Sequence, residues 1–241
     1  MMQTTKNPWK NAWTGFCAVL LLLSSISHGA EQKTFREEAQ FEIRVAGREI
    51  GQEKFSIQGT DDSVRSHSTM SFQDPADSRQ NVKMETELTM DDRFVPTSYQ
   101  LQTDASGQKG IMRGTFASGQ ASFEFTAAAG RPSKTGLLVG ERYVVLDTNV
   151  FHHFVFIARL FDFSSKEKSQ SLEVVIPQEL QKGLLKVSEI ALEKVAIRGK
   201  RRELHHLTAD SGQVQIDLWV DDQHILYKIA MPVKGIEVVR K

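Results

Sequence analysis

The sequence predicts a mainly β protein built on one curved antiparallel sheet, an unclosed β-barrel or half-barrel, with one short apolar helix over its concave face. Three observations support this prediction. Most of the chain alternates between apolar and polar residues, glycine-containing turns separate the alternating stretches, and one stretch, 150–161, has helical spacing instead. A β-sandwich is the alternative fold, because two stacked sheets would cover each other's apolar faces.

The first thirty residues have the pattern of a secretory signal peptide. Two lysines and no acidic residue precede an apolar run that ends in four leucines (20–23), and small or polar residues follow up to Ala30. This run is shorter than the roughly 20 apolar residues that span a bilayer. We therefore expect residues 1–30 to be cleaved and residues 31–241 to form a single β-rich domain, periplasmic or secreted, without a transmembrane segment.

The composition of the expected mature chain excludes several classes of protein. Cys17, the only cysteine, lies in the leader, so residues 31–241 form no disulfide. The leader carries two of the 30 basic residues and none of the 30 acidic ones, which leaves 28 against 30 and a net charge of −2. A chain without a net basic charge is not expected to bind nucleic acid. No motif for a cofactor is present, and we expect none.

Period-two alternation identifies the strands. Clear examples are the stretches 41–47, 121–127, 214–220 and 225–231. In the last of these we expect one face to carry Ile225, Tyr227, Ile229 and Met231, and the other Leu226, Lys228 and Ala230. Turns are predicted at 46–48, 104–110, 117–120 and 210–213, where Gly allows a positive φ. The ambiguous segment 177–197 favours strands broken by a turn near Gly183 over a helix that starts at Pro177.

The stretch 150–161 is the one good helix candidate. Apolar residues recur at helical spacing, the remaining positions are also largely apolar, and Asp147, Thr148 or Asn149 is a suitable N-cap. A helix that is apolar on all sides must be buried or covered. Such a helix would be about 18 Å long, which is too short to cross a membrane.

Histidine and aspartate pairs are the candidates for chemistry. His152 and His153 are neighbours in the expected helix, where their side chains diverge by about 100°, and His205 and His206 point to opposite faces of a strand. Neither spacing matches a known metal or hydrolase motif. We expect one helix histidine to bond a neighbouring backbone group and the other to face water. A His-dependent or metal-dependent enzyme is the less favoured alternative.

Two turns share a paired acid. The segments "ELTMDDRFVPTSY" (87–99) and "DLWVDDQHILYKI" (217–229) align on Asp91–Asp92 and Asp221–Asp222. Aspartate pairs are candidate cation ligands, but the further ligands of a calcium loop are missing, so the pattern favours side chains that cap turns. We therefore expect no metal.

Taken together, these segments resemble a known group of envelope proteins. The opening hairpin "FEIRVAGREIGQEKFSI", the polar "ETELTMDDRFVPTSYQL", the late "IDLWVDDQHILYKI" and an apolar helix between them are similar in order to uncharacterised relatives of the LolA–LppX type of periplasmic lipoprotein and lipid carriers. The resemblance implies an unclosed barrel with short helices over a greasy concave face, and no catalytic residues. This chain departs from it in having no second lid helix and no lipobox cysteine.

Physical reasoning leads to the same function. One short helix is too small to cover the dry face of a large sheet, and apolar surface left in water costs about 25 cal/mol per Å². We expect a carrier or chaperone that binds a lipid, a lipoprotein acyl chain or another hydrophobic molecule, with an envelope protein as a further candidate partner and no catalytic activity. The alternative is a packed structural or interaction module without a ligand. The expected ligand-binding residues are Phe151, Phe154, Val155, Ile157, Ala158, Phe161, Ile216, Leu218 and Tyr227.

Overall fold

The computed structural model describes residues 34–73, 80–127 and 132–241. The expected leader lies outside the described residues. The strands are β1 (Phe35–Val45), β2 (Arg48–Gly59), β3 (Ser63–Gln73), β4 (Asn81–Asp91), β5 (Pro96–Ala105), β6 (Gln108–Ala117), β7 (Gln120–Ala127), β8 (Ser133–Leu138), β9 (Tyr143–Val145), β10 (Ser169–Ile176), β11 (Gln181–Ile197), β12 (Lys200–Asp210), β13 (Gln215–Val220), β14 (Leu226–Met231) and β15 (Ile236–Arg240). The helical elements are α1 (Phe154–Leu160) and the 3-10 segments η1 (Phe151–His153), η2 (Pro177–Glu179) and η3 (Pro232–Lys234).

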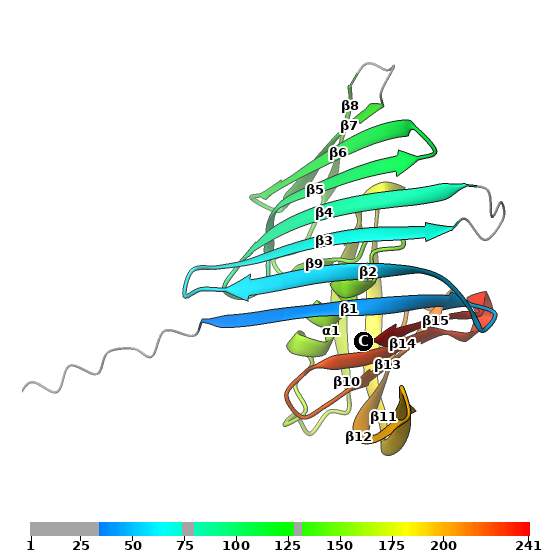
Figure 1. The fold of residues 1–241 in the computed structure, drawn as a ribbon. Helices are drawn as coiled ribbons and strands as arrows, with labels where there is room; N and C mark the ends of the chain where they lie inside the picture. The colour runs from blue at the N-terminus through cyan, green and yellow to red at the C-terminus, as the bar shows by residue number, and fades with distance from the viewer. Residues whose placement is uncertain (1–33, 74–79, 128–131) are drawn as a thin grey trace, which may run out of the picture. The chain divides into compact units, whose positions relative to one another are not determined.

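All fifteen strands belong to one sheet in the order β8-β7-β6-β5-β4-β3-β2-β1-β15-β14-β13-β12-β11-β10-β9. Every pairing is antiparallel except that of β9 with β10, which is parallel. The pairing of β1 with β15 joins the two halves of the chain into this single sheet (Figure 1). Because β8 and β9 remain as two unjoined edges, the curved sheet is unclosed, which confirms the predicted fold class.

Two-residue turns connect several of the strands. Ala46 and Gly47 both have positive φ, 49° and 79°, which is the type I′ geometry that matches the twist of paired strands. The same pair of positive angles occurs at Ser106–Gly107, Ser118–Gly119 and Arg198–Gly199. The segment 177–197 is mostly strand rather than helix, as favoured, but its turn lies at a different position than predicted. The turn lies at η2 and Leu180, and β11 runs through Gly183 without a break, with a register shift between Glu189 and Ala191.

The two paired-acid turns have the same structure. The Asp91 carboxylate accepts hydrogen bonds from the backbone N–H groups two and four residues later, at 2.9 and 2.8 Å. The Asp221 carboxylate does the same, at 2.9 Å in both cases. Both turns also hold an aromatic residue with left-handed φ, 64° at Phe94 and 62° at His224. These carboxylates cap turns, as the sequence favoured.

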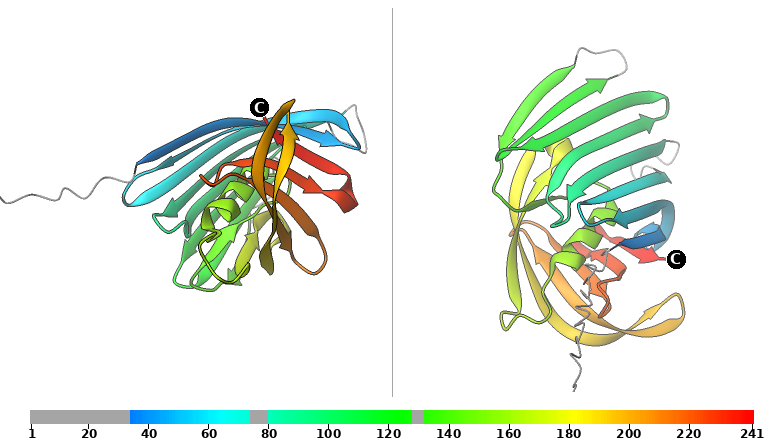
Figure 2. Two further views of the ribbon diagram at one scale, coloured as in Figure 1. Left: turned by 90° about the horizontal axis from the view of Figure 1, so that it is seen from below. Right: turned by 90° about the vertical axis from the view of Figure 1, so that its left-hand side faces the viewer.

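The predicted helix forms, although it is shorter and begins differently than expected. η1 and α1 together cover 151–160, within the curve of the sheet (Figure 2, right). Its side chains are buried against the concave side: Phe154, Val155, Phe156, Ile157 and Ala158 are at most 4% exposed. No helix in the described part of the chain has the length and apolar character needed to cross a bilayer.

A buried carboxylate caps the helical segment in place of the three residues proposed from the sequence. Val150 is the N-cap residue and provides no side-chain bond. Instead, Glu53 on β2 accepts hydrogen bonds at 3.0 Å from the backbone N–H groups of Phe151 and His152. Its other oxygen lies 2.6 Å from His152 Nδ1. The expected N-cap role for Asp147 is wrong because its carboxylate accepts instead from the N–H groups of Thr148 and Gln178.

The far end of α1 is anchored by two further strands and a turn. His224 Nδ1 donates to the carbonyl oxygen of Ala158 at 2.8 Å, from the second of the paired-acid turns. The carboxylate of Glu37 on β1, itself 6% exposed, binds Arg159 of α1 and Arg240 of β15. Polar contacts from the strands and from this turn therefore hold both ends of the helix.

A second, smaller apolar cluster lies on the opposite face of the sheet. Ile197, Leu204 and Val239 are buried there, with Trp219 and Tyr227 against them. Tyr227 was expected on the same face as Ile229. A register shift in the pairing of β13 with β14, between Trp219 and Val220, breaks the alternation, so that Leu226 and Ile229 face the main core and Tyr227 does not.

We predict that replacing Glu53 with Ala lowers the free energy of unfolding by about 3–5 kcal/mol, because each buried donor left without an acceptor costs about 1–3 kcal/mol. The change leaves two backbone donors and one imidazole without an acceptor. Urea unfolding followed by circular dichroism measures the effect. Glu85→Ala is the matched control, since Glu85 lies on the outer face and its side chain is 49% exposed. We expect that control to change stability by less than about 0.5 kcal/mol, and an equal loss in both variants would contradict the capping role.

Candidate functional site

A cluster of polar side chains lies within the core beside the start of the helical segment. Besides Glu53, it contains His152, His153, Asp147 and Tyr99, each at most 3% exposed. His153 Nδ1 accepts a hydrogen bond from the backbone N–H of Asp147 at 3.2 Å, and the Tyr99 hydroxyl donates to the Asp147 carboxylate at 2.7 Å. The cluster ties the loop before the helix to β5.

Burial shifts the pKa of three groups in this cluster, Tyr99, Asp147 and His153. It raises the pKa of Tyr99 well above its usual value, and the neighbouring Asp147 carboxylate adds to this effect. Burial also raises the pKa of Asp147, although hydrogen bonds to its carboxylate from Gln178, Tyr99 and Thr148 oppose the increase. The pKa of His153 is well below its usual value because burial, and to a lesser extent the adjacent His152, disfavour the protonated form of its ring.

Both helix histidines are fully buried. The expected bond to a neighbouring backbone group is present at His153, but the expectation that the other imidazole faces water is wrong. His152 is turned inward because its Nδ1 binds Glu53, while the Nε2 atoms of both rings have no hydrogen-bond partner within the described residues. In the same part of the chain, no group of three or more His, Cys, Asp or Glu side chains is arranged to hold a metal ion.

The second histidine pair is split between the two faces of β12, as predicted. His205 lies between two carboxylates, with Nδ1 2.6 Å from Glu189 and Nε2 2.8 Å from Asp222. His206 stacks on Trp219 on the other face, with ring centroids 4.7 Å apart. His205 and His206 therefore do not form a shared site with each other.

A cavity of about 440 Å³ remains in the concave side, away from the helix; we call it the open cavity. It lies between the inner faces of β5–β8 and the turn formed by η2 and Leu180. Its apolar lining consists of Leu101, Met112, Phe123, Phe125 and Leu180. Gly110, Lys134 and four neutral polar residues complete it: Thr103, Ser133, Thr135 and Gln178. Phe125 and Leu180 are each 43% exposed, so two apolar side chains of this cavity are accessible to solvent.

Leu180 has a conformation that is unfavourable for its residue type. Its backbone is left-handed, with φ 52° and ψ 41°. The matching turn after η3 has the same proline-started geometry and holds Gly235 at the equivalent position, with φ 62° and ψ 22°. A left-handed conformation costs a residue with a side chain roughly 1–2 kcal/mol. The chain therefore places a large apolar side chain at the cavity where glycine would fit the backbone better.

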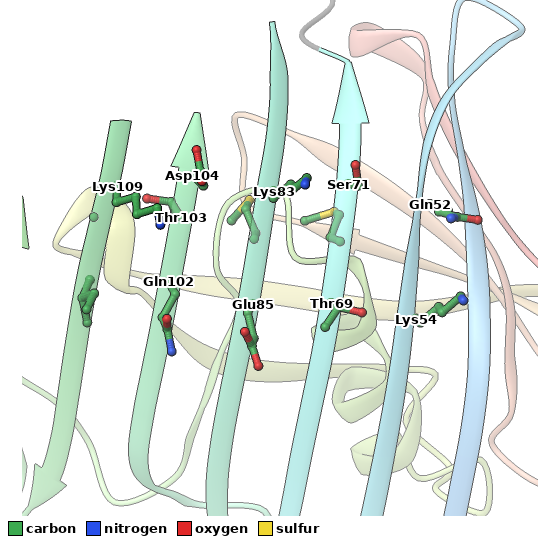
Figure 3. A pocket seen from close by; sticks show the side chains of 14 residues that line it. Gln52, Lys54, Thr69, Ser71, Lys83, Glu85, Gln102, Thr103, Asp104 and Lys109 are labelled. Carbon is green, nitrogen blue, oxygen red and sulfur yellow. The ribbon is translucent and has the colours of Figure 1, made fainter. Parts of the chain in front are cut away.

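Other hollows lie elsewhere on the sheet. A groove of about 490 Å³ on the outer face of β2–β6 is lined mostly by polar side chains, including lysines that alternate with acids (Figure 3). A cavity of about 340 Å³ lies between the start of the helical segment and strands β10, β11 and β13–β15. A hollow of about 160 Å³ lies at the end of α1. The open cavity and the cavity at the start of the helical segment both combine apolar side chains with a position on the concave face, but the second also carries Asp147, Glu179, Lys182 and Lys234.

The residues proposed as a ligand site from the sequence are distributed around the core. Phe151, Phe154 and Ile216 line the cavity at the start of the helical segment, and Ile157 and Phe161 line the small hollow at its end. Val155, Ala158 and Leu218 are fully buried and line none of these spaces. Tyr227 lies in the second cluster.

The residues that line the open cavity were not predicted as a site, although the sequence pattern indicated the apolar character of two of them. The alternation of 121–127 already placed Phe123 and Phe125 on one dry face. Nothing in the sequence indicated that the helix would fill the other half of the curve, or that Leu180 would lie across from these strands. That juxtaposition depends on tertiary packing.

Comparison with known proteins supports the fold alone. No protein-family model matches the chain, and no match was found among curated proteins. The chain is similar to a beta-barrel-like protein of the domain of unknown function DUF1849 from Brucella abortus, at 10% identity and a TM-score of 0.56, over 86% of this chain and 94% of that chain. A DUF1089 family protein from Pseudomonas aeruginosa is similar at 11% identity and a TM-score of 0.46, over 76% of this chain and 90% of that chain.

The first of these likenesses and the geometry define a class: a β-barrel-like module with an unclosed sheet and an incompletely filled interior. Neither solved structure is described as a LolA- or LppX-type carrier. The resemblance drawn from the sequence therefore stays a prediction.

We predict that stability decreases as the pH falls below about 6.5, the usual pKa of histidine. The unfolded chain binds a proton at His153 there that the folded protein excludes, so acidification favours unfolding and stability recovers as the pH rises. His153→Gln, whose amide oxygen can accept the Asp147 N–H, should show a shallower decrease in urea unfolding between about pH 7 and pH 5. Both proteins keep Asp147, so the difference between their curves reports His153. Parallel curves would contradict its exclusion of the proton.

Proposed function

We propose that the protein is a binding module for a hydrophobic small molecule, such as a lipid or an acyl chain, and that it acts in the periplasm or outside the cell without catalysing a reaction. The open cavity carries this proposal. Its volume of about 440 Å³ is within the range of about 300–1,000 Å³ that is usual for small-molecule sites, and its few neutral polar groups are typical of them.

Leu180 supports the same proposal. A backbone conformation that costs free energy persists where the surrounding structure or a function maintains it. The side chain that results is half exposed and faces an apolar wall, so it contributes nothing to a closed core. A bound apolar molecule would cover this side chain and Phe125 together, removing both from water.

The charges at the cavity indicate the kind of molecule that fits. Among the described residues, Lys134 is the one charged residue in its lining, and its ammonium group lies 3.0 Å from the Glu124 carboxylate. The remaining polar groups are hydroxyls and an amide. These groups favour an uncharged head group, such as an ester or an alcohol, over a free carboxylate.

The packed structural module remains the second candidate, and one observation favours it. Helix α1 and its neighbours fill most of the concave side, with Val155, Phe156 and Ala158 at 0% exposure. In that case the open cavity would hold only water and take up no apolar probe.

We predict that Thr103→Phe prevents the uptake of a dansyl-labelled undecanoyl ester. Thr103 pairs with Gly110 across β5 and β6, so a phenyl ring there would occupy the cavity over the glycine. Gln102→Phe is the matched control, because it adds the same ring one residue earlier, on the outer face. Dansyl fluorescence and native mass spectrometry measure the uptake. Equal uptake by both variants would exclude this cavity as the site, and no uptake by the unaltered protein would favour the packed module.

We predict that Leu180→Gly separates binding from stability. Relief of the left-handed strain offsets the added freedom of glycine in the unfolded chain, so the free energy of unfolding should change by less than about 1 kcal/mol. Loss of the covering side chain should weaken binding of the same dansyl ester about tenfold, as expected for one lost apolar contact of about 1.4 kcal/mol. Fluorescence titration and urea unfolding check the two outcomes. A large loss of stability with unchanged affinity would show that Leu180 is structural.

A further inference from the structure

The end of the β11–β12 hairpin, residues 190–203, differs in charge from the rest of the chain; we call it the basic arm. It contains five basic residues and two acidic ones, a formal net charge of +3, whereas residues 31–241 as a whole have a net charge of −2. The five basic residues are Lys194, Arg198, Lys200, Arg201 and Arg202. Figure 1 and the right-hand view of Figure 2 show this end of the hairpin at the margin of the sheet.

One face of the basic arm is bound to the sheet. Ile197 and Leu204 are buried in the second apolar cluster, and the guanidinium of Arg202 lies 4.4 Å from the centre of the Tyr227 ring. Glu193 accepts a hydrogen bond from Trp219 Nε1 at 2.6 Å. One of the two acidic side chains of the arm is therefore engaged on the face of the second apolar cluster, and packing on that face holds the arm in place.

The opposite face is exposed and cationic. Strand pairing sets Lys194 opposite Glu203 and Ala196 opposite Arg201, and all four of these residues are exposed. Within the described part of the chain, Lys194, Lys200 and Arg201 form no ion pair. Their charges are therefore available to a partner.

Aliphatic side chains lie beside these charges. Ile190 is 58% exposed and Leu192 is 53% exposed. Ile190 lies at the register shift in the β11–β12 pairing, where the strand carries one extra residue. Exposed aliphatic side chains next to lysine and arginine are the combination that binds anionic membrane surfaces, through charge attraction together with shallow apolar insertion.

We propose that the basic arm docks the protein on an anionic phospholipid surface. The aliphatic pair favours a lipid surface over nucleic acid, which would be bound by charge together with aromatic stacking. The inference does not depend on the open cavity, which lies at β5–β8, in the other half of the strand order. A negative result for membrane docking would therefore leave the proposal of ligand binding untouched, and the reverse also holds.

The outer groove of Figure 3 is a suitable comparison surface. It also carries three lysines, Lys54, Lys83 and Lys109, but Glu85 and Asp104 lie among them. The pairing register places Asp104 directly between Lys83 and Lys109. A row of alternating charges has little net field, so this groove should not bind an anionic surface.

Cosedimentation of the purified full chain with vesicles tests the proposal. The unaltered protein should bind vesicles of phosphatidylcholine with phosphatidylglycerol, should not bind vesicles of phosphatidylcholine alone, and should be released by high salt. The double variant Lys194→Glu and Arg201→Glu should lose about tenfold or more in partition coefficient. The control variant Lys54→Glu and Lys83→Glu should bind as before. Every variant shares residues 1–30, so the difference between them reports the arm.

A second variant distinguishes lipid from other polyanions. Ile190→Ser with Leu192→Ser keeps every charge, and it should weaken binding to the anionic vesicles while circular dichroism remains unchanged. Equal binding to both kinds of vesicle, or equal loss in the control variant, would overturn the proposal. If the serine variant binds the vesicles as before and duplex DNA binds as tightly as the vesicles, the arm binds polyanions in general. That outcome would also overturn the proposal of membrane docking.

Discussion

The carboxylate of Glu53 is the contact on which the interior of this protein depends. An apolar helical segment inside a curved sheet has free backbone N–H groups at its start, which need an acceptor once they are removed from water. Glu53 reaches in from β2 and satisfies two of these groups and the His152 ring. The same contact sets the depth of the segment, because the phenylalanines that follow pack where the capped end places them. A missing side chain at this position would leave three donors buried and unpaired.

Pairs of similar turns position the elements around that helix. The two paired-acid turns share one hydrogen-bonding pattern, and each directs its left-handed aromatic residue toward the helix. Phe94 reaches Phe156 with ring centroids 6.1 Å apart, and His224 binds the carbonyl of Ala158. The two proline-started turns, at η2 and η3, are also alike, except that Leu180 takes the place of Gly235. This exception lies at the open cavity. Because the η3 turn forms without backbone strain and the η2 turn accepts strain at Leu180, we infer that the η2 position requires a large side chain.

The sheet is thus divided into a filled half and a partly open half. The helix, its capping contacts and the buried polar cluster occupy most of the curve near β1, β2 and β13–β15, apart from the cavity of about 340 Å³ at the start of the helical segment. Bonds to fully buried groups hold this half in place. The part of the inner face of β5–β8 around Thr103, Gly110 and Phe125 has the η2 turn across from it, and Phe125 stays partly exposed there. In our proposals, a small apolar molecule occupies the open half, while the basic arm, on the other half of the sheet, presents positive charge to a membrane surface.

The sequence by itself determined the class of fold and the character of its parts. Period-two alternation and glycine turns specify strands locally, and a stretch that is apolar on all sides, such as 150–161, has no stable place outside a core, so sheet and helix were both predictable. The split of His205 and His206 between two faces follows from strand geometry alone. Tertiary structure decided the rest. The cap at Glu53 joins segments far apart in the chain, the displacement of Tyr227 results from one register shift, and the cavity at Leu180 exists because two distant segments meet across a gap. Local sequence patterns carry no information about these long-range contacts, because the contacts depend on which faces of the folded sheet pack together.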